Sequence, residues 1–549
     1  MKAFLMYRDR DFDPQHILAR RAREVRRGEG PKLEQLLPWN EQALRQDLGL
    51  DILLSAMAAK DIFLFEVAKV AVLSSLADVD TIRYRQSVLR DCLQHESIVR
   101  EIYQLAIDAI EGERKHYLSF FVRYPSGILS RAVDVLQMFV GMLKALRAIA
   151  DRHGEKFESD GFSRLFAMLR QELSDEYFAR IEKHLKQLKF RKGVLISAQL
   201  GQGNKGTKYA LRKSHEDRRN WYLRLLPQKV RGYTFQLHPR DEAGAKALGE
   251  LRDQGVNLVA NALAQSADHI LSFFEMLRTE LAIYVGCLNL QRQLTQLRKP
   301  TCFPVAAPTG ERRLSFSSVY DPCLALTAGR KVVGNDLNAD GKDLIVITGA
   351  NTGGKSTFMR SLGLAQLMMQ AGMVVPAERF AAEVRQGLLT HYKREEDVTM
   401  ESGKLDEELG RMSGIVDKIT PNSMVLLNES FAATNEREGS EIARQITNAL
   451  VDGGVKVCFV THLYDFAHSL YAKNMPNAIF LRAERLPDGT RTFRMIKAEP
   501  LQTSYGKDVY DSVFGPERSS SIERETTSAA ALASQPRASN AKFLRRVRC

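Results

Sequence analysis

The chain has 549 residues, of which 44% are hydrophobic, and this length allows roughly three or four domains with sizeable cores. Its 79 Lys and Arg against 66 Asp and Glu give a formal charge of +13, which favours a polyanionic partner unless the charge is simply spread over a solvated surface. The charged amino end excludes a secretory signal, and no apolar run approaches the ~18 residues of a membrane span. The six cysteines are scattered, which suits a reducing compartment. We therefore expect a cytoplasmic protein with no membrane partner.

The first part of the chain is dominated by a helical pattern. Residues 1–50 are a mixed N-terminal segment that predicts little. Over residues 51–188, apolar residues recur three and four apart while Pro and Gly are sparse, which predicts long helices packed together. The same pattern returns over residues 241–300. Two helical stretches that flank an insertion predict a pair of antiparallel arms with a module at their far end.

The insertion, residues 189–240, breaks the helical pattern. Alternating stretches and clustered glycines predict a small β-rich or irregular module. Its Lys and Arg residues are dense and are interleaved with Tyr and Trp, a composition suited to contacting a nucleic-acid backbone. A solvated hairpin whose lysines keep a strand edge from pairing is an equally good interpretation of this segment alone.

A glycine-rich motif organises the rest of the chain. The apolar run Leu344–Ile347 predicts a buried parallel strand, and it leads into G-x-x-x-x-G-K-[ST] followed by a helical pattern. This is the phosphate-binding loop in its required setting, and the agreement of motif and context disfavours a chance match. We expect Lys355 to reach the β- and γ-phosphates of ATP and Ser356 to hold Mg²⁺. The residues predicted to bind ATP here are Gly349, Asn351, Gly353, Gly354, Lys355, Ser356 and Thr357.

A second buried strand, residues 423–427, ends in two further candidate residues. A carboxylate beside the γ-phosphate can polarise the attacking water, so Glu429 is the predicted general base. A helix-terminal carboxylate that is favoured by the helix dipole is the alternative for Glu429. Asn428 is predicted to bind ATP and its metal ion through its amide oxygen. This oxygen carries no negative charge, which should weaken metal binding.

Two weaker signals accompany these residues. A third strand, residues 456–460, ends at His462, which we predict to sense the γ-phosphate, although a lone histidine is more often structural. Ser402 and Gly403 precede a helical pattern, and the resulting helix terminus suits an anion if it faces a second subunit. Taken alone this signal is weak, and a plain helix cap is the better interpretation of Ser402.

Several blocks together resemble the MutS family of ABC-type ATPases. The blocks are ITGANTGGKSTFMRSLGLAQLMMQAGMVVPA, NESFAATNEREG, VTHLYDFA, PLQTSYG and VGNDL, with an I-x-x-R-Q match in residues 82–86. The resemblance is strong over residues 300–515 and moderate over residues 51–300. It departs from the family at Asn428, where Asp is usual, and at Thr352, where Met is usual.

Other family features are not found in the sequence. We identify no mismatch-reading domain at the amino end and no small nuclease domain. Phe273-Phe274-Glu275 has the spelling of the mismatch-reading motif, but it lies on a helical pattern and is predicted to be core. A Ser-, Ala- and Thr-rich segment, residues 516–549, stands where a helix-turn-helix dimerisation segment is expected, and we predict it to be a disordered basic tail.

The resemblance implies an α/β P-loop ABC-type ATPase domain, residues 301–515, C-terminal to an all-α core and lever domain with a small β-rich clamp-like insertion. It implies an ATPase that uses ATP and Mg²⁺, forms a homodimer through its ATPase domains, and clamps double-stranded DNA in mismatch repair or in recognition of DNA structure. The predicted DNA contacts are Lys205, Lys208, Arg212 and Lys213, and the residues predicted to complete the partner's site are Ser402, Thr434 and Asn435.

Two alternatives remain. One is a nucleotide-gated protein with slow turnover that binds branched DNA or ribosomes. The other, a transporter ATPase subunit, is disfavoured by the helical arms and the basic insertion.

Overall fold

A computed structural model describes residues 1–12, 37–115, 124–190, 193–213, 233, 235–329, 332–394 and 403–502. The chain divides into two units, residues 1–504 and 505–549. Ser402 and the predicted tail lie outside the described residues.

The amino-terminal half is helical, as the periodicity predicts. Four of its helices begin at short polar side chains: Asp61, Asp78, Ser159 and Ser174 each accept hydrogen bonds from backbone N–H groups of the first turn, which satisfies donors that the helix itself leaves unpaired. The helices are α2 (Glu41–Leu48), α3 (Leu50–Ala58), α4 (Ile62–Leu73), α5 (Val79–Gln94), α6 (Glu96–Lys115), α7 (Pro125–His153), α8 (Asp160–Glu172) and α9 (Asp175–Leu188).

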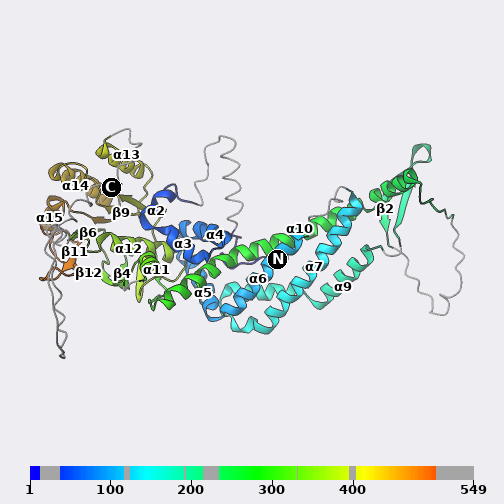
Figure 1. The fold of residues 1–549 in the computed structure, drawn as a ribbon, viewed down its shortest axis with the longest axis horizontal. Coiled ribbons are helices and arrows are strands. Elements are labelled where there is room, and N and C mark those ends of the chain that lie inside the picture. Colours follow the sequence, from blue (N-terminus) through cyan, green and yellow to red (C-terminus); the bar gives the residue numbers. More distant parts are fainter. Residues whose placement is uncertain are drawn as a thin grey trace, which may run out of the picture. The chain divides into compact units, whose positions relative to one another are not determined.

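The returning helical stretch is one continuous helix, α10 (Glu242–Gln296), of 55 residues. Figure 1 shows it running beside α7 and α6, against which it packs. Phe273 and Phe274 are buried, and the Phe274 ring lies 5.8 Å from that of Phe139 on α7, so the prediction that they belong to the core is confirmed. None of the helices in the described ranges is long and apolar enough to cross a bilayer.

The described part of the insertion contains an antiparallel hairpin of β1 (Leu195–Leu200) and β2 (Gly206–Arg212). The hairpin packs on the amino-terminal half of α10, where Ile196 lies so close to Gly255 that a Cβ there would be 2.5 Å from the Ile196 side chain. The glycine is therefore needed for this close approach.

The amino-terminal segment is fixed by one buried carboxylate that sequence reasoning did not single out. Glu280 on α10 is fully buried and accepts hydrogen bonds from the backbone N–H groups of Leu5, Met6 and Phe12, at 2.6, 3.2 and 3.2 Å. Burial raises the pKa of Glu280 to about 7, while the three N–H donors act in the opposite direction.

Two sheets are found among the described residues of the carboxyl-terminal half. A six-stranded sheet has the order β12-β11-β6-β10-β9-β8 and is parallel except for β12, and a four-stranded sheet has the order β3-β7-β4-β5. The strands are β3 (Val305–Ala307), β4 (Leu314–Val319), β5 (Asn335–Asn338), β6 (Leu344–Gly349), β7 (Arg379–Glu383), β8 (Leu388–Tyr392), β9 (Met424–Asn428), β10 (Lys456–Val460), β11 (Ala478–Arg485) and β12 (Arg491–Lys497). The helices among them are α11 (Pro322–Ala328), α12 (Lys355–Gln370), α13 (Lys404–Val416), α14 (Glu436–Asp452) and α15 (Tyr464–Ala472).

The parallel strands are buried on both faces, which explains their continuous apolar runs. Leu344 and Val346 of β6 belong to a core cluster that includes residues of α13, α14 and α15. Ile345 and Ile347, which point the other way, belong to the larger cluster that includes α12 and the helical half of the chain. The central sheet is thus held between two apolar layers.

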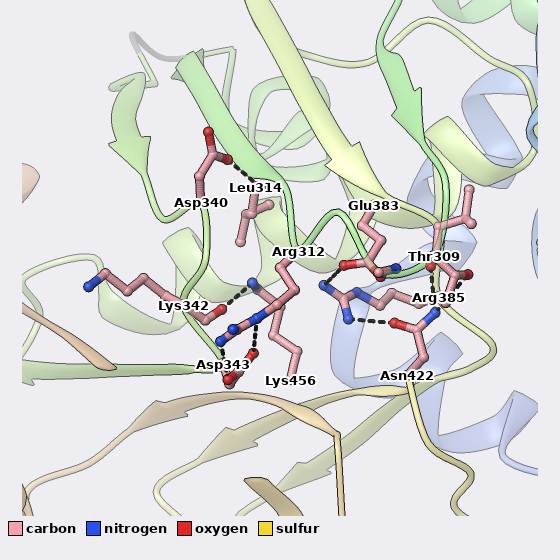
Figure 2. A network of polar contacts seen from close by, with 12 residues as sticks. Thr309, Arg312, Leu314, Asp340, Lys342, Asp343, Glu383, Arg385, Asn422 and Lys456 are labelled. Carbon is pink, nitrogen blue, oxygen red and sulfur yellow. Dashed lines mark hydrogen bonds and ion pairs between the residues drawn. The ribbon is translucent and has the colours of Figure 1, made fainter. Parts of the chain in front are cut away.

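A polar network joins the two sheets at the amino ends of β6, β9 and β10 (Figure 2). Arg312, before β4, pairs with Asp343, before β6. Arg385, after β7, pairs with Glu383 at 3.0 Å and donates to Asn422, before β9, at 2.8 Å. The end of the sheet that carries the glycine-rich motif is the opposite one.

Candidate functional site

The predicted site residues follow three neighbouring parallel strands. In the pairing register, Val460 of β10 lies opposite Ile347 of β6 on one side and opposite Asn428 of β9 on the other. The three strands therefore end at the same level, and the segments that follow them meet at one edge of the sheet. This is the edge at which open α/β sheets bind ligands.

The glycine-rich loop, residues 349–354, is shaped by the space and backbone angles that glycine allows. Gly349 has φ +109°, and a Cβ there would lie 2.9 Å from the backbone nitrogen of Ala483 on β11. Gly354, with φ +90°, is the residue from which α12 begins. A side chain at either position would strain the loop or displace its neighbours.

Lys355 lies folded into the loop. Its side chain is buried, and its Nζ donates hydrogen bonds to the carbonyl oxygens of Gly349 and Ala350, both at 3.0 Å. Burial lowers the pKa of Lys355 to about 8, and the nearby Glu429 carboxylate acts in the opposite direction. A cation held only by neutral carbonyl oxygens is well placed to take an anionic partner.

Two oxygen-bearing side chains meet beside the loop. The Ser356 hydroxyl, in the first turn of α12, donates a hydrogen bond of 2.9 Å to Oδ1 of Asn428 at the end of β9. Hydroxyl and amide oxygens are ligands that suit Mg²⁺, and the Glu429 carboxylate follows directly in the chain, so this donor set fits the predicted cation. Thr357 lies in the same helical turn and is partly buried.

Glu429 and His462 form a pair. The His462 ring donates from Nε2 to Oε1 of Glu429 at 3.2 Å, and the backbone N–H of Glu429 donates to the Val460 carbonyl at 2.8 Å. The hydrogen bond from His462 is the main reason that the pKa of Glu429 is lowered, with burial acting the other way. Glu429 is therefore a carboxylate at neutral pH, as a general base must be.

Lys355, Ser356 and Glu429 line a cavity of about 470 Å³, and Asn428 and His462 are hydrogen-bonded to two of these lining residues. One part of its wall is the polar loop with Lys355, Ser356 and Glu429, and the other part is largely apolar, with Tyr320, Leu324, Val332 and Phe493. A cavity with one polar and one apolar part suits a ligand that combines phosphates with a planar base.

Sequence reasoning missed the contribution of β12 to this cavity. Phe493 lines it, and Arg491 donates from Nε to the carbonyl oxygen of Asn351 at 2.7 Å. Asn335, within the VGNDL block, fixes this strand, because its side chain accepts from the Met495 N–H at 2.7 Å and donates to the Phe493 carbonyl at 3.3 Å. No short sequence motif marks β12. The VGNDL block, which contains Asn335, was the one signal in the sequence from which this part of the cavity could have been found.

The residues predicted to face a partner subunit have local contacts within this chain. Asn435 caps α14 by accepting from the Glu438 N–H at 3.0 Å, and Thr434 donates to the Glu438 carboxylate at 2.7 Å. A role toward a partner remains a prediction for both residues.

The four basic residues predicted to contact nucleic acid are exposed on the β1–β2 hairpin and just after it. Arg212 donates from Nε to the Ser197 hydroxyl across the hairpin at 2.7 Å, which fixes one side of its guanidinium group. The remaining residues of this set are Lys205, Lys208 and Lys213.

Comparison with known proteins agrees with these features. Residues 77–297 match the family model described as the MutS2 N-terminal domain, and residues 345–531 match the one described as MutS domain V. The chain belongs to the MutS family. The resemblance that the sequence blocks suggested is therefore confirmed, and the second match covers the polar part of the cavity wall, with the glycine-rich loop and Glu429, while the wall residues from Val319 to Asn335 precede it.

Individual MutS relatives align with less than half of this chain. The DNA mismatch repair protein MutS of Thermotoga neapolitana is 33% identical over 199 residues, which is 35% of this chain and 23% of that protein. MutS protein homolog 4 of Mus musculus is 24% identical over 247 residues, which is 45% of this chain and 24% of that protein. The chain thus spans about a quarter of the length of these curated relatives.

Proposed function

We propose that this MutS-family chain is an ATPase that couples ATP binding at residues 349–357 to the binding of double-stranded DNA by its basic hairpin. The observation that carries the proposal is that Lys355, Ser356 and Glu429 line one cavity, while Asn428 and His462 are hydrogen-bonded to Ser356 and Glu429. A buried lysine, two metal-type oxygens and an ionised carboxylate are the parts that phosphoryl transfer to water requires.

Each residue has a distinct role in the proposed reaction. Lys355 exchanges its two carbonyl partners for phosphate oxygens, and Ser356 and Asn428 would hold Mg²⁺. When bound, that ion neutralises charge on the phosphates. Glu429 accepts a proton from the attacking water, and His462 keeps the carboxylate oriented and ionised. Ser402, Thr434 and Asn435 would complete the site of a second subunit, so that ATP favours a dimer through the ATPase domains.

The direct test is to measure ATP hydrolysis and ATP affinity of the purified chain with and without duplex DNA. We expect hydrolysis in both conditions and a change in the affinity for ATP when DNA is added, because the coupling free energy between two binding sites acts in both directions. An identical affinity for ATP at saturating DNA would contradict the coupling, and co-sedimentation with ribosomes in place of DNA binding would identify a different partner.

A second candidate function is favoured by Asn428. A nucleotide-gated protein that turns over slowly would bind branched DNA or ribosomes and use ATP mainly as a switch. Asn428 supports it because its amide oxygen, already bonded to Ser356, offers the metal no negative charge. We expect Asn428→Asp to lower the Mg²⁺ concentration needed for half-maximal hydrolysis and to raise kcat. An unchanged Mg²⁺ requirement would remove the support for slow turnover.

The role of the hairpin in DNA binding gives a further prediction. Neutralising Lys205, Lys208, Arg212 and Lys213 together should weaken binding to all duplex sequences about equally, because phosphate contacts carry no sequence information. The slope of log affinity against log salt should flatten by up to ~0.9 for each phosphate that the variant no longer neutralises. The measurement is a salt titration of DNA affinity for the wild type and this variant.

A matched control keeps the change in net charge equal. It neutralises four exposed basic residues elsewhere in the chain: Lys60, Arg83, Arg152 and Lys473. If the control flattens the slope as much as the hairpin variant does, general charge and not the hairpin drives binding. ATP affinity without DNA should be the same for all three proteins.

A further inference from the structure

The turn that carries Glu429 has an unusual backbone. Glu429 has φ +54° and Phe431 has φ +64°, and neither residue is glycine. Residues with a Cβ rarely adopt this left-handed backbone conformation. They keep it only where the surrounding structure holds them in it. Ser430 and Phe431 are fully buried, so the groups that hold the turn lie beneath it and away from the cavity.

One of these groups is Glu408 on α13. Its side chain is 1% exposed, and Oε2 accepts a hydrogen bond of 3.0 Å from the backbone N–H of Phe431. Burial raises the pKa of Glu408, with the N–H donor acting the other way. Within the described residues, its second oxygen, Oε1, has no hydrogen-bond partner. Burying a carboxylate with only one of its oxygens hydrogen-bonded costs free energy. We therefore regard the contact of Glu408 with the turn as a functional feature of the site.

The other group is His391 on β8, which is fully buried. Its Nε2 lies 3.0 Å from the carbonyl oxygen of Glu408, and its Nδ1 lies 2.7 Å from the Ser430 hydroxyl. Because a carbonyl can only accept, Nε2 carries the proton. Burial lowers the pKa of His391 to about 4, so the ring is neutral and Nδ1 is an acceptor. The single proton of the Ser430 hydroxyl is shared between Nδ1 and the backbone carbonyl of His391, which lies 2.8 Å from that hydroxyl. The ring also stacks on Phe431, with centroids 5.6 Å apart.

These contacts join three elements at the back of the cavity. His391 connects β8 to both α13 and the turn, and Glu408 connects α13 to the turn directly. Helix α13 begins at Lys404, immediately after the segment that contains Ser402, the residue predicted to face a partner subunit. A displacement of α13 would therefore change the support beneath Glu429.

We propose that Glu408 and His391 are positioning residues that hold Glu429 in place, so that activation of water depends on where α13 lies. This inference rests on the proposed function for the role of Glu429. Neither residue lines the cavity, and both act through the turn. The proposal deepens the ATPase assignment by naming the helix, α13, whose position regulates hydrolysis.

The first test separates kcat from KM. Glu408→Ala should lower kcat by about 10- to 100-fold, because a displacement of about 1 Å at a catalytic group has effects of this size, while KM for ATP stays within about twofold. Glu408→Gln keeps an oxygen acceptor for the Phe431 N–H and should restore most of kcat. Unchanged kcat in Glu408→Ala would overturn the proposal.

The matched control is Glu383→Ala. Glu383 is also a buried carboxylate that accepts a backbone hydrogen bond, from the Gly310 N–H at 2.6 Å, but it belongs to the network at the opposite end of the sheet (Figure 2). Both alanine variants should lose stability, and only Glu408→Ala should lose kcat. Equal losses of kcat would mean that destabilisation alone explains the effect.

A double variant tests whether Glu408 acts through Glu429. If it does, Glu408→Ala should change the residual rate of Glu429→Gln by less than about twofold, because residues that act as a unit have non-additive effects. A further loss equal to that in the wild-type background would show an independent role and overturn the proposal.

A third measurement does not depend on turnover. Hydrogen exchange of the peptide that contains residues 428–431 should be faster in Glu408→Ala than in wild type or Glu383→Ala, since the Phe431 N–H loses its acceptor. Unchanged exchange would overturn the proposal even if the chain is an active ATPase. Faster exchange in a chain without ATPase activity would instead contradict the proposed function.

Discussion

Lys355→Ala is expected to abolish tight ATP binding. Its ammonium group is buried at the glycine-rich loop and is held there by two carbonyl oxygens, so it is available to phosphate oxygens at little reorganisation cost. Two hydrogen bonds between charged groups contribute about 3–6 kcal/mol, which corresponds to a loss of affinity of about a hundredfold or more. Isothermal titration calorimetry with ATP and Mg²⁺ measures this loss directly.

Lys456 provides the control for this variant. It is also a buried lysine, at the start of β10, and burial likewise lowers its pKa to about 8, but it lies at the opposite end of the strands. Lys456→Ala should keep ATP affinity within a few-fold of wild type, with any loss confined to thermal stability. Wild-type affinity in a folded Lys355→Ala protein would show that ATP binds elsewhere.

Proton uptake gives a second readout of the same assignment. The pKa of Lys355 in the free protein, about 8, lies below its ordinary value of 10.5, so the side chain loses its proton as the pH rises through 8. ATP needs the ammonium form, and binding at pH 8 should therefore take up about half a proton. Calorimetry in two buffers of different ionisation enthalpy measures this uptake, and Lys355→Ala should lack it.

Glu429→Gln should hydrolyse ATP about 10²- to 10⁴-fold more slowly than wild type while it binds ATP equally well. The amide keeps the shape of the side chain but cannot accept a proton from water. Single-turnover hydrolysis and the affinity for ATP are the two measurements. Glu441→Gln, on an exposed position of α14, is the control and should leave both unchanged. Wild-type hydrolysis by Glu429→Gln would place the general base at another residue.

The strands that carry the site were predictable because their signals are local. The runs that became β6, β9 and β10 each contain four consecutive apolar residues, and each is followed by residues with an evident chemistry: the glycine-rich motif, Glu429 and His462. A parallel sheet brings the ends of such strands together whatever lies between them in the chain. The glycine-rich motif and the rule that parallel strands bind ligands at their carboxyl ends were therefore enough to predict where in the sheet the candidate site lies.

The supporting residues were not predictable in this way. His391 and Glu408 touch the turn from positions 39 and 23 residues away in the chain, and Glu280 meets Leu5 across 275 residues. A single histidine or glutamate has no periodicity, and its importance comes only from what the fold places beside it. The returning helix was predicted as a helical stretch, but its continuity over 55 residues depends on packing against α7 and α6.

The continuity of α10 has a consequence for sensitivity to small rotations. From Gly255, where the basic hairpin packs, to its end at Gln296, the helix spans roughly 60 Å at 1.5 Å per residue. A rotation of one degree about the Gln296 end would move the Gly255 end by about 1 Å over this span. Because a hydrogen bond weakens steeply over such a distance, a few degrees of tilt would be enough to break the phosphate contacts that we propose for the hairpin.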